Sequence, residues 1–447
     1  MEIRVGLVSL GCSKNQVDAE RMLYKIMEKG YSLVGDAALA DVAIINTCGF
    51  IESAKQEAIE TILEFAQLKK EGRIKHIIIT GCLAERYKNE VIKEIPEADA
   101  VIGIGSNDSI TDVIEKVCSG ERVLSFEDKY KLSLTGKRVQ TTLSFTSYLK
   151  IAEGCSNCCS YCAIPSIRGK YRSVPMDELV SEAKELVRNG VRELILIAQD
   201  TTRYGEDLYG EPTLHVLIGE LCRIEELKWI RILYLYPERI TDKILDTIAT
   251  QDKVVKYIDM PIQHCNGEIL KRMNRPGDEA MLRRLVHKIR RKIPEIVLRT
   301  TFITGFPGET EEQFNELADF ARDMEFERLG CFPYSAEEGT KAALMDGQLD
   351  DEVKQHRADI IMEQQMMIVN NKNARFIGKT IEVVCEGYDR YGECYFGRSY
   401  MDSPEIDGKV FFTSPKRRLV PGIFVKVKIT EIMDYDLIGD VVDESAQ

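Results

Sequence analysis

Residues 153–162 read Glu153-Gly154-Cys155-Ser156-Asn157-Cys158-Cys159-Ser160-Tyr161-Cys162, the most informative stretch of the chain. Within it Cys155, Cys159 and Cys162 have the spacing C-x3-C-x2-C, whereas Cys158 is out of step and is expected to be a bystander. Three thiolates this close together can bind three irons of a 4Fe–4S cluster and leave the fourth iron open. An open iron can bind a small molecule, which indicates chemistry rather than storage.

A zinc site or a pair of disulfides is the alternative explanation for these cysteines. Zinc usually takes two C-x2-C-like pairs or additional histidines, and the chain contains only five His. Disulfides belong to oxidising compartments. The spacing therefore favours the cluster.

The sequence around this stretch alternates short apolar strands with helices. Six strands are predicted, at Tyr148–Ala152, Glu193–Ala198, Trp229–Leu235, Val255–Met260, Val297–Ile303 and Arg328–Phe332. Helices are predicted between them, for example at Asp177–Asn189, Thr241–Ala249, Glu279–Lys292 and Glu311–Met324. This order predicts a partial (βα)6 barrel over residues 140–372, with its chemistry at the carboxyl-terminal mouth. The cysteine loop follows the first strand and should lie at that mouth.

A smaller α/β domain is predicted over residues 1–135. Its strands are expected at Ile3–Leu10, Asp41–Thr47 and Ile74–Thr80, and its helices at Val17–Lys29 and Ser53–Leu68. Alternation of this kind predicts a parallel sheet with helices on its faces.

Each of these three strands ends in a cysteine beside a glycine: Gly11-Cys12, Cys48-Gly49 and Gly81-Cys82. Open parallel sheets bind ligands at the carboxyl ends of their strands, so the three thiols should converge on one edge. Cysteine is also often a small buried hydrophobe, which is the alternative. Its recurrence at the end of three successive strands favours a second three-cysteine cluster.

The hydrophobic pattern changes in the carboxyl-terminal part of the chain. Asp350–Asn373 is predicted to be a connecting helix, and after it the hydrophobic period changes to two, as in Val425, Val427 and Ile429. Several such runs with Gly and Pro turns predict a small all-β barrel over residues 375–443. Between Arg375 and Gln447 ten Lys and Arg stand against thirteen Asp and Glu, a net charge of −3.

The composition narrows the possible partners. The chain has 447 residues and a net charge of −13, which argues against a nucleic-acid binder and fits a basic partner. The N-terminus shows no signal-peptide pattern, and no apolar run approaches the ~20 residues of a membrane helix. A cytoplasmic protein is expected, in which thirteen cysteines indicate metal binding or catalysis.

Further candidate residues for cofactor binding are Tyr161, Gly305, Phe306, Pro307, Gly308 and Glu309. Tyr161 is placed either to lie near a bound adenine or to cover the cluster. Glycines after the fifth barrel strand allow close backbone approach to a ligand, although a tight turn explains them equally well. Arg168, Lys170 and Arg172 form either a carboxylate-binding cluster or a solvated loop.

Taken together, these residues resemble the methylthiotransferase family of radical S-adenosylmethionine (SAM) enzymes over the whole chain. The resemblance implies an α/β protein with an N-terminal methylthiotransferase domain, a central radical SAM barrel and a C-terminal TRAM barrel. It implies two 4Fe–4S clusters, an auxiliary one on Cys12, Cys48 and Cys82 and a SAM cluster on Cys155, Cys159 and Cys162. It also implies that SAM serves both as methyl donor and as radical source, and that the segment Gly305–Glu309 lines the SAM pocket.

Two branches of this family differ in substrate. One modifies an isopentenylated adenosine of tRNA, and the other adds a β-methylthio group to an aspartate of small-subunit ribosomal protein twelve. Four segments of this chain are similar to the ribosomal-protein branch: Ser9–Asn15, Asn46–Ile51, Ala198–Thr202 and Pro261–His264. Ser13 departs from it, because that branch often has proline there.

The resemblance therefore implies a transferase acting on a basic ribosomal protein, with a low-potential electron donor such as flavodoxin or ferredoxin. The acidic C-terminal domain is expected to dock this substrate beside the barrel mouth. The alternatives are the tRNA-modifying branch and an electron carrier without catalysis. Carriers normally supply four cysteines to each cluster, which argues against the second alternative.

Overall fold

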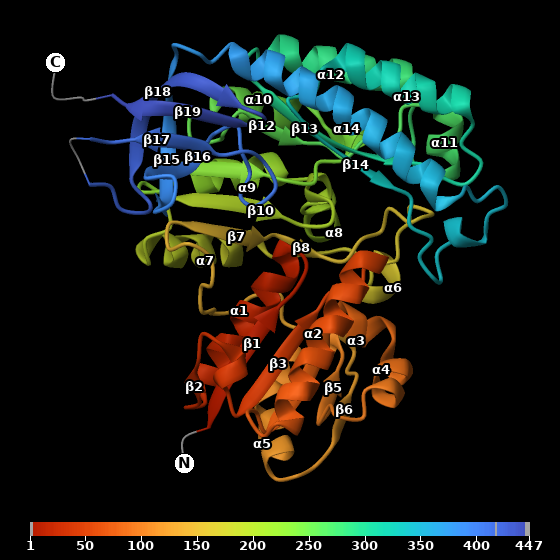
Figure 1. Ribbon diagram of the computed structural model, residues 1–447, viewed down its shortest axis with the longest axis vertical. Coiled ribbons are helices and arrows are strands. Elements are labelled where there is room, and N and C mark those ends of the chain that lie inside the picture. Colours follow the sequence, from red (N-terminus) through yellow and green to blue (C-terminus); the bar gives the residue numbers. More distant parts are fainter. Residues whose placement is uncertain (1–2, 416–417, 443–447) are drawn as a thin grey trace.

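The computed structural model describes residues 3–415 and 418–442, which form three packed parts (Figure 1). A parallel α/β domain holds the N-terminus. A partial βα barrel lies above it in this view, and a small β-barrel lies against one end of the βα barrel. The predicted fold class is confirmed, while the predicted domain boundaries at 1–135, 140–372 and 375–443 stay predictions.

The N-terminal domain is a six-stranded parallel sheet in the order β2-β1-β3-β4-β5-β6. Its strands are β1 Arg4–Ser9, β2 Ser32–Leu33, β3 Val42–Thr47, β4 His76–Gly81, β5 Ala100–Ile102 and β6 Val123–Ser125. Its helices are α1 Ser13–Glu28, α2 Glu52–Lys70, α3 Cys82–Arg86, α4 Lys88–Glu94 and α5 Ile110–Cys118. The strand order reverses direction at β1 and β3, and ligands of open α/β sheets bind at such a switch point.

The central domain contains the six predicted parallel strands as two ladders, β7-β10-β11 and β12-β13-β14. They span β7 Thr146–Lys150, β10 Glu193–Ile197, β11 Trp229–Ile232, β12 Tyr257–Asp259, β13 Val297–Thr304 and β14 Arg328–Pro333. A single parallel bridge from Ile230 to Val254 joins the ladders, together with a hydrogen bond from Leu235 N to Asp259 O (2.9 Å). Strands β7 and β14 are the outer strands of this row, so the barrel is partial, as predicted.

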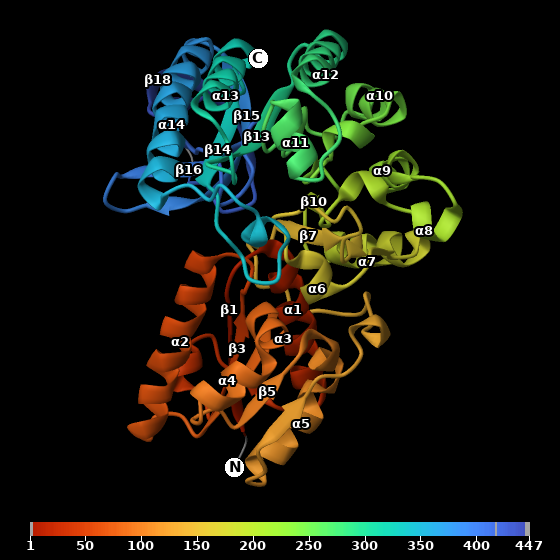
Figure 2. The ribbon, with the colours of Figure 1, turned by 90° about the vertical axis from the view of Figure 1, so that its right-hand side faces the viewer.

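Helices cover the outer face of these strands (Figure 2). The helices of the central domain are α6 Ile164–Arg168, α7 Met176–Arg188, α8 Glu206–Tyr209, α9 Leu214–Cys222, α10 Asp242–Thr250, α11 Gly267–Arg272, α12 Glu279–Lys292, α13 Glu311–Met324 and α14 Asp351–Ala374. Of these, α6 lies at the junction with the N-terminal domain, against α3. A short antiparallel pair, β8 Ala152–Glu153 and β9 Arg172–Ser173, flanks the cysteine loop.

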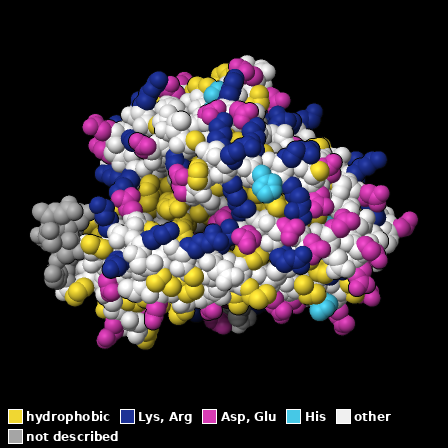
Figure 3. All heavy atoms as spheres, turned by 90° about the horizontal axis from the view of Figure 1, so that it is seen from above, with side chains coloured by type: hydrophobic (Ala, Val, Ile, Leu, Met, Phe, Trp, Pro, Cys, Tyr) yellow, Lys and Arg dark blue, Asp and Glu magenta, His cyan; other side chains and the backbone are white. Residues whose placement is uncertain are grey.

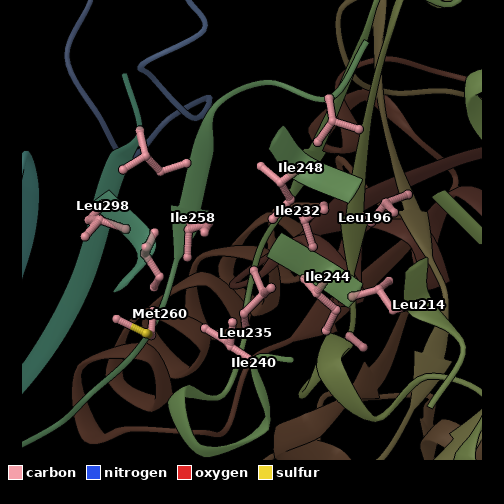
Figure 4. Close-up of a cluster of buried hydrophobic side chains, with 14 of the residues drawn as sticks. Leu196, Leu214, Ile232, Leu235, Ile240, Ile244, Ile248, Ile258, Met260 and Leu298 are labelled. Carbon is pink, nitrogen blue, oxygen red and sulfur yellow. The ribbon is translucent and has the colours of Figure 1, made fainter. Parts of the chain in front are cut away.

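The core of the central domain lies between strands and helices (Figure 4). Leu196 and Ile232 of the strands pack against Leu214 of α9 and against Ile244 and Ile248 of α10, and all five are buried. Burial of each such side chain stabilises the fold by ~1.5–3 kcal/mol. This layer fixes the strand ends that carry the site.

The C-terminal domain is a closed barrel in the order β15-β16-β17-β19-β18. Its strands are β15 Thr380–Asp389, β16 Cys394–Ser399, β17 Val410–Thr413, β18 Phe424–Met433 and β19 Asp436–Val441. Val425, Val427 and Ile429 are buried, while Lys426 and Lys428 between them are exposed, as the period of two predicted.

This small barrel packs against the amino-terminal ends of the βα-barrel strands. Arg398 contacts Glu193 at the first position of β10, and Arg328 at the first position of β14 pairs with Asp402. Tyr257, which begins β12, donates to Asp407 (2.6 Å). The expectation that the C-terminal domain lies beside the carboxyl-terminal mouth is therefore wrong, because it closes the opposite end.

The charge count of the C-terminal segment was also misleading. Asp402 and Asp407 are buried against arginines of the central domain, and Glu386 pairs with the buried Arg398. Asp402 and Asp407 thus join the two domains, while Glu386 forms its ion pair within the barrel, and none of the three adds to an exposed acidic surface. On the face shown in Figure 3, Lys and Arg side chains are interspersed with Asp and Glu.

Among the described residues, no helix combines the length and the apolar character that crossing a membrane would need.

Candidate active site

The first three predicted cysteines meet at the switch point of the N-terminal sheet. Cys48 and Cys82 directly follow β3 and β4, and Cys12 lies just beyond β1. The charges of Cys12 and Cys48 both act on the thiol of Cys82, and that of Cys12 acts on Cys48. Gly11 has φ +85°, and a Cβ there would lie 2.8 Å from Cys48 Sγ. Glycine at this position therefore lets the first strand end approach the second thiol.

The three thiols differ in their surroundings. Burial opposes ionisation of Cys12, but the nearby charges of Lys14 and Arg168 outweigh it and lower the pKa of this thiol. Cys12 also caps the N-terminus of α1, whose backbone N–H groups favour a thiolate. Burial raises the pKa of Cys48, and it raises the pKa of Cys82 to about 12.

The second set of predicted cysteines lies in the loop between β8 and α6. Cys155 N donates to Gly169 O (3.0 Å), Cys162 N donates to Cys159 O (3.1 Å), and Ile164 N donates to Cys162 Sγ (3.4 Å). Burial raises the pKa of Cys155 to about 11 and raises that of Cys162 as well, and the charge of Cys159 acts on both. The structure thus brings these three thiols together. Cys158 between them is exposed and has φ 54°.

Each set of three thiols fits an iron–sulfur cluster better than a single ion. In residues 3–415 and 418–442, no group of three or more His, Cys, Asp and Glu side chains has the arrangement that would hold one metal ion. Ligands of one zinc ion must all lie within ~2.3 Å of a common point. The thiolates of a 4Fe–4S cluster bind separate irons, so they can stand further apart.

A buried ionic network connects the two sets of cysteines. Arg168, which follows the SAM-type cysteine loop and is 2% exposed, donates to Cys82 Sγ of the N-terminal set (3.4 Å). It also pairs with Asp18 of α1 (2.9 Å) and with Glu153 (3.1 Å). Lys150 of β7 pairs with the same two carboxylates. Two cations and two anions thus compensate one another at the domain junction.

The sequence did not predict this buried ionic network. For Arg168 the sequence left open a carboxylate-binding cluster or a solvated loop, and its burial excludes the solvated loop for this residue. Lys150 was part of a predicted strand. A lysine inside an apolar strand was the available signal, because a charge there needs a buried partner. Asp18 lies 132 residues away, and the sequence contains nothing that identifies it as that partner.

Tyr161 lies among residues of both the cysteine loop and the barrel mouth. It packs against a hydrophobic cluster that contains Phe306 and Tyr334. Burial and the neighbouring charge of Cys159 raise its pKa. Tyr236 OH lies 3.8 Å from Cys159 Sγ, and the guanidinium of Arg275 stacks 4.3 Å from the ring of Tyr236. Aromatic rings therefore line the cysteine loop, and the two roles considered for Tyr161, beside an adenine or over the cluster, stay predictions.

The segment Gly305–Glu309 forms a closed turn after β13. The single backbone N–H of Gly305 is shared between both carboxylate oxygens of Glu309 (3.0 Å each), and Arg357 of α14 donates to the same carboxylate (2.6 Å). A Cβ on Gly305 would lie 2.3 Å from Lys354, and one on Gly308 would lie 2.2 Å from Arg272. Pro307 is buried within the turn. These contacts account for the glycines as turn residues, and a SAM-binding role of the segment stays a prediction.

Residues 334–349 form a connection between β14 and α14 that reaches the N-terminal domain (Figure 2). Glu337 pairs with Arg86 (2.9 Å) and with Lys55 (3.3 Å). Ala342 N donates to Ser160 O in the cysteine loop (2.9 Å). The connection therefore contacts both cysteine-bearing domains, and its lack of hydrophobic periodicity left it without a prediction.

Comparison with known proteins places the chain among well-defined families. Residues 4–103 match the model described as "Uncharacterized protein family UPF0004", residues 149–321 the Radical SAM superfamily, and residues 377–442 the TRAM domain. A curated protein of Thermoanaerobacter sp. (strain X514), named ribosomal protein uS12 methylthiotransferase RimO, is 50% identical over 98% of this chain and 99% of its own length. The protein of the same name from Caldanaerobacter subterraneus subsp. tengcongensis is 51% identical over the same shares.

Among solved structures, the fold resembles the radical SAM methyltransferase TsrM from Kitasatospora setae, with a TM-score of 0.53 and 13% sequence identity. The alignment covers 74% of this chain and 73% of that one. At this identity the likeness concerns the fold alone.

Proposed function

This chain belongs to the family of ribosomal protein uS12 methylthiotransferases, and from that premise we propose that it adds a methylthio group to an aspartate of the small-subunit ribosomal protein uS12. The enzyme class is a radical SAM transferase. The observation that carries the proposal is the meeting of two three-cysteine sets at one domain junction, where Arg168 of the central domain contacts Cys82 of the N-terminal domain.

Two 4Fe–4S clusters are proposed as resident cofactors. The thiols of Cys155, Cys159 and Cys162 would hold the cluster that binds SAM, and those of Cys12, Cys48 and Cys82 would hold the auxiliary cluster. Once bound, the first cluster would supply the electron for the reductive cleavage of SAM, and the auxiliary cluster would hold the sulfide that is methylated and transferred. Each set offers three thiols, which leaves one iron of each cluster free for a reactant.

The residues of the chain itself position and shield this chemistry. The network of Arg168, Lys150, Asp18 and Glu153 fixes the N-terminal sheet edge against the barrel mouth. The connection 334–349 bridges the same two domains from another side. Such anchoring holds the two cofactor sites in one geometry, which a transfer between them requires.

We further propose a cytoplasmic location and a low-potential protein electron donor such as flavodoxin or ferredoxin. Tyr161 and the segment Gly305–Glu309 are proposed to contact SAM. The packing of Tyr161 against Phe306 supports a shared pocket wall.

The test is a direct comparison of substrates. Anaerobically reconstituted enzyme is incubated with SAM, a reductant and either purified uS12 or isopentenylated tRNA. We expect mass spectrometry to find one added methylthio group on an aspartate of uS12 and none on the tRNA. The reverse result would assign the chain to the tRNA-modifying branch.

A further inference from the structure

Lys14 is a buried cation at the domain junction that has no carboxylate partner among the described residues. It is the second residue of α1, two positions after Cys12, and its side chain is 6% exposed. Its ammonium lies 3.3 Å from the centre of the Tyr234 ring. Within the described part of the chain, the ammonium has neither an ion-pair partner nor a hydrogen-bond acceptor.

The other buried cations of this junction are neutralised. Lys150 and Arg168 share Asp18 and Glu153, and Arg138 pairs with Glu20 (3.1 Å). A buried charge without a partner is costly, and a cation–π contact offsets only part of that cost. Lys14 is not fully enclosed, since 6% of the residue is exposed. Its ammonium can therefore contact an anion bound at the domain junction.

The position of Lys14 relates it to both proposed cofactor sites. Its charge acts on Cys12 of the N-terminal set. The ring that it contacts belongs to Tyr234, two residues beyond the end of β11 at the barrel mouth. The backbone N of Tyr234 donates to the carboxylate of Asp259 (2.9 Å). An anion bound to Lys14 would lie at the junction that both cysteine sets face.

We propose that Lys14 binds the side-chain carboxylate of the substrate aspartate, an inference that rests on the proposed function. This carboxylate is bonded directly to the β-carbon that accepts the methylthio group. Holding the carboxylate therefore holds the reacting carbon at the junction. An isopentenylated adenosine has no carboxylate, so the same lysine favours a protein substrate over tRNA. Lys14 thus acts as a positioning and specificity residue and takes no part in bond making.

The test compares two peptides of uS12, one with the target aspartate and one with asparagine in its place. Their dissociation constants are measured anaerobically with reconstituted wild-type enzyme and with the variants Lys14→Met, Lys14→Gln and Lys14→Arg. Lys25→Met is the matched control, because Lys25 lies on the same helix and pairs with Asp108 instead. Iron content and unfolding temperature establish that each variant folds.

We expect wild-type enzyme and Lys25→Met to bind the aspartate peptide about tenfold more tightly than the asparagine peptide, as a charge-assisted contact predicts. Lys14→Met and Lys14→Gln should bind the two peptides equally, and Lys14→Arg should retain part of the preference. The dissociation constant of SAM should be unchanged in all variants.

An aspartate preference that survives in both Lys14→Met and Lys14→Gln would overturn this inference alone. So would a loss of SAM affinity with an unchanged peptide ratio, since the carboxylate held by Lys14 would then be that of SAM. Wild-type enzyme that neither binds the peptides nor modifies intact uS12 would overturn the proposed function itself, and this inference with it.

Discussion

Glu193 offers a sharp test of how the C-terminal barrel is held to the central domain. Its carboxylate is fully buried and accepts hydrogen bonds from Arg398 (2.7 Å), Arg231 (3.1 Å) and Thr146 (3.1 Å). Burial alone would raise its pKa, but the two arginines outweigh burial and lower that pKa to about 2. The substitution Glu193→Gln keeps the shape of the side chain and removes its charge.

Two independent estimates give the size of the destabilisation expected for Glu193→Gln. A fall of the pKa from its ordinary 4.5 to about 2 corresponds to ~3 kcal/mol of stability, at ~1.4 kcal/mol for each pKa unit. Removing one partner of a buried ion pair costs ~3–5 kcal/mol in other proteins. We therefore expect Glu193→Gln to destabilise the junction between the two domains by about 3 kcal/mol at neutral pH.

The single tryptophan of the chain makes the assay specific. Trp229 of β11 packs edge-on against Phe424 of β18, with ring centres 4.9 Å apart, so its fluorescence reports separation of these two domains. Urea unfolding is followed by this signal in wild type, in Glu193→Gln and in a matched control, Glu382→Gln. Glu382 joins the same domains through a half-exposed pair with Lys228 and should matter by less than ~1 kcal/mol.

The pH dependence supplies a second readout with a defined sign. Because the pKa of Glu193 is lowered in the folded protein, its contribution is complete above pH 4.5 and is lost as the pH falls toward 2. Wild type should therefore lose stability through this window more steeply than Glu193→Gln. Equal urea midpoints for Glu193→Gln and Glu382→Gln, or equal acid dependence for Glu193→Gln and wild type, would refute the reasoning.

Three further predictions concern the cofactor sites. Reconstituted protein should contain about eight irons per chain. Alanine at all three cysteines of either set should halve that number. If the iron content is unchanged after the N-terminal set is replaced, those thiols are core residues. Alanine at Cys155, Cys159 and Cys162 should abolish the formation of 5′-deoxyadenosine, which chromatography detects. Replacing the N-terminal set should preserve 5′-deoxyadenosine formation and abolish methylthio transfer. Wild-type amounts of 5′-deoxyadenosine from the first variant would contradict the assignment. Arg168→Gln should lower the free energy of unfolding by ~3–5 kcal/mol, because it leaves Asp18 and Glu153 undercompensated. Arg172→Gln loses bonds to two backbone carbonyls and a contact with the Tyr130 ring but no ion pair, so it should cost less than half of that in the same urea titration.

Elements with long apolar runs were the predictable part of this fold. Predicted strand Glu193–Ala198 and observed β10 differ by one residue, because a strand buried on both faces is apolar throughout. Strands β2, β5 and β6 were missed, since two or three residues are too few to show a pattern. The meeting of Cys12, Cys48 and Cys82 was predictable because the carboxyl ends of parallel strands share one edge.

Contacts between domains were not predictable in the same way. Glu193 and Arg398 are 205 residues apart, and nothing in the sequence identifies them as partners. The acidic excess of the C-terminal segment had suggested a docking surface, yet Asp402 and Asp407 are buried in the interface. A charge count treats every ionisable residue as exposed, and it fails where carboxylates hold two domains together.

Buried ionic groups join the three domains at both junctions, and this arrangement determines from which side a substrate can approach. Buried ionic groups fix the C-terminal barrel at the amino-terminal ends of the strands and the N-terminal sheet at their carboxyl-terminal ends. With one end of the barrel closed by the C-terminal domain, a polypeptide must approach from the mouth, where α1, the cysteine loop and the connection 334–349 meet. At that junction the cations Lys150, Arg168 and Arg138 are each matched by a carboxylate of the chain, whereas Lys14 is not. The charge of Lys14 acts on the thiol of Cys12, and the substrate carboxylate that we propose would be the second anion beside it.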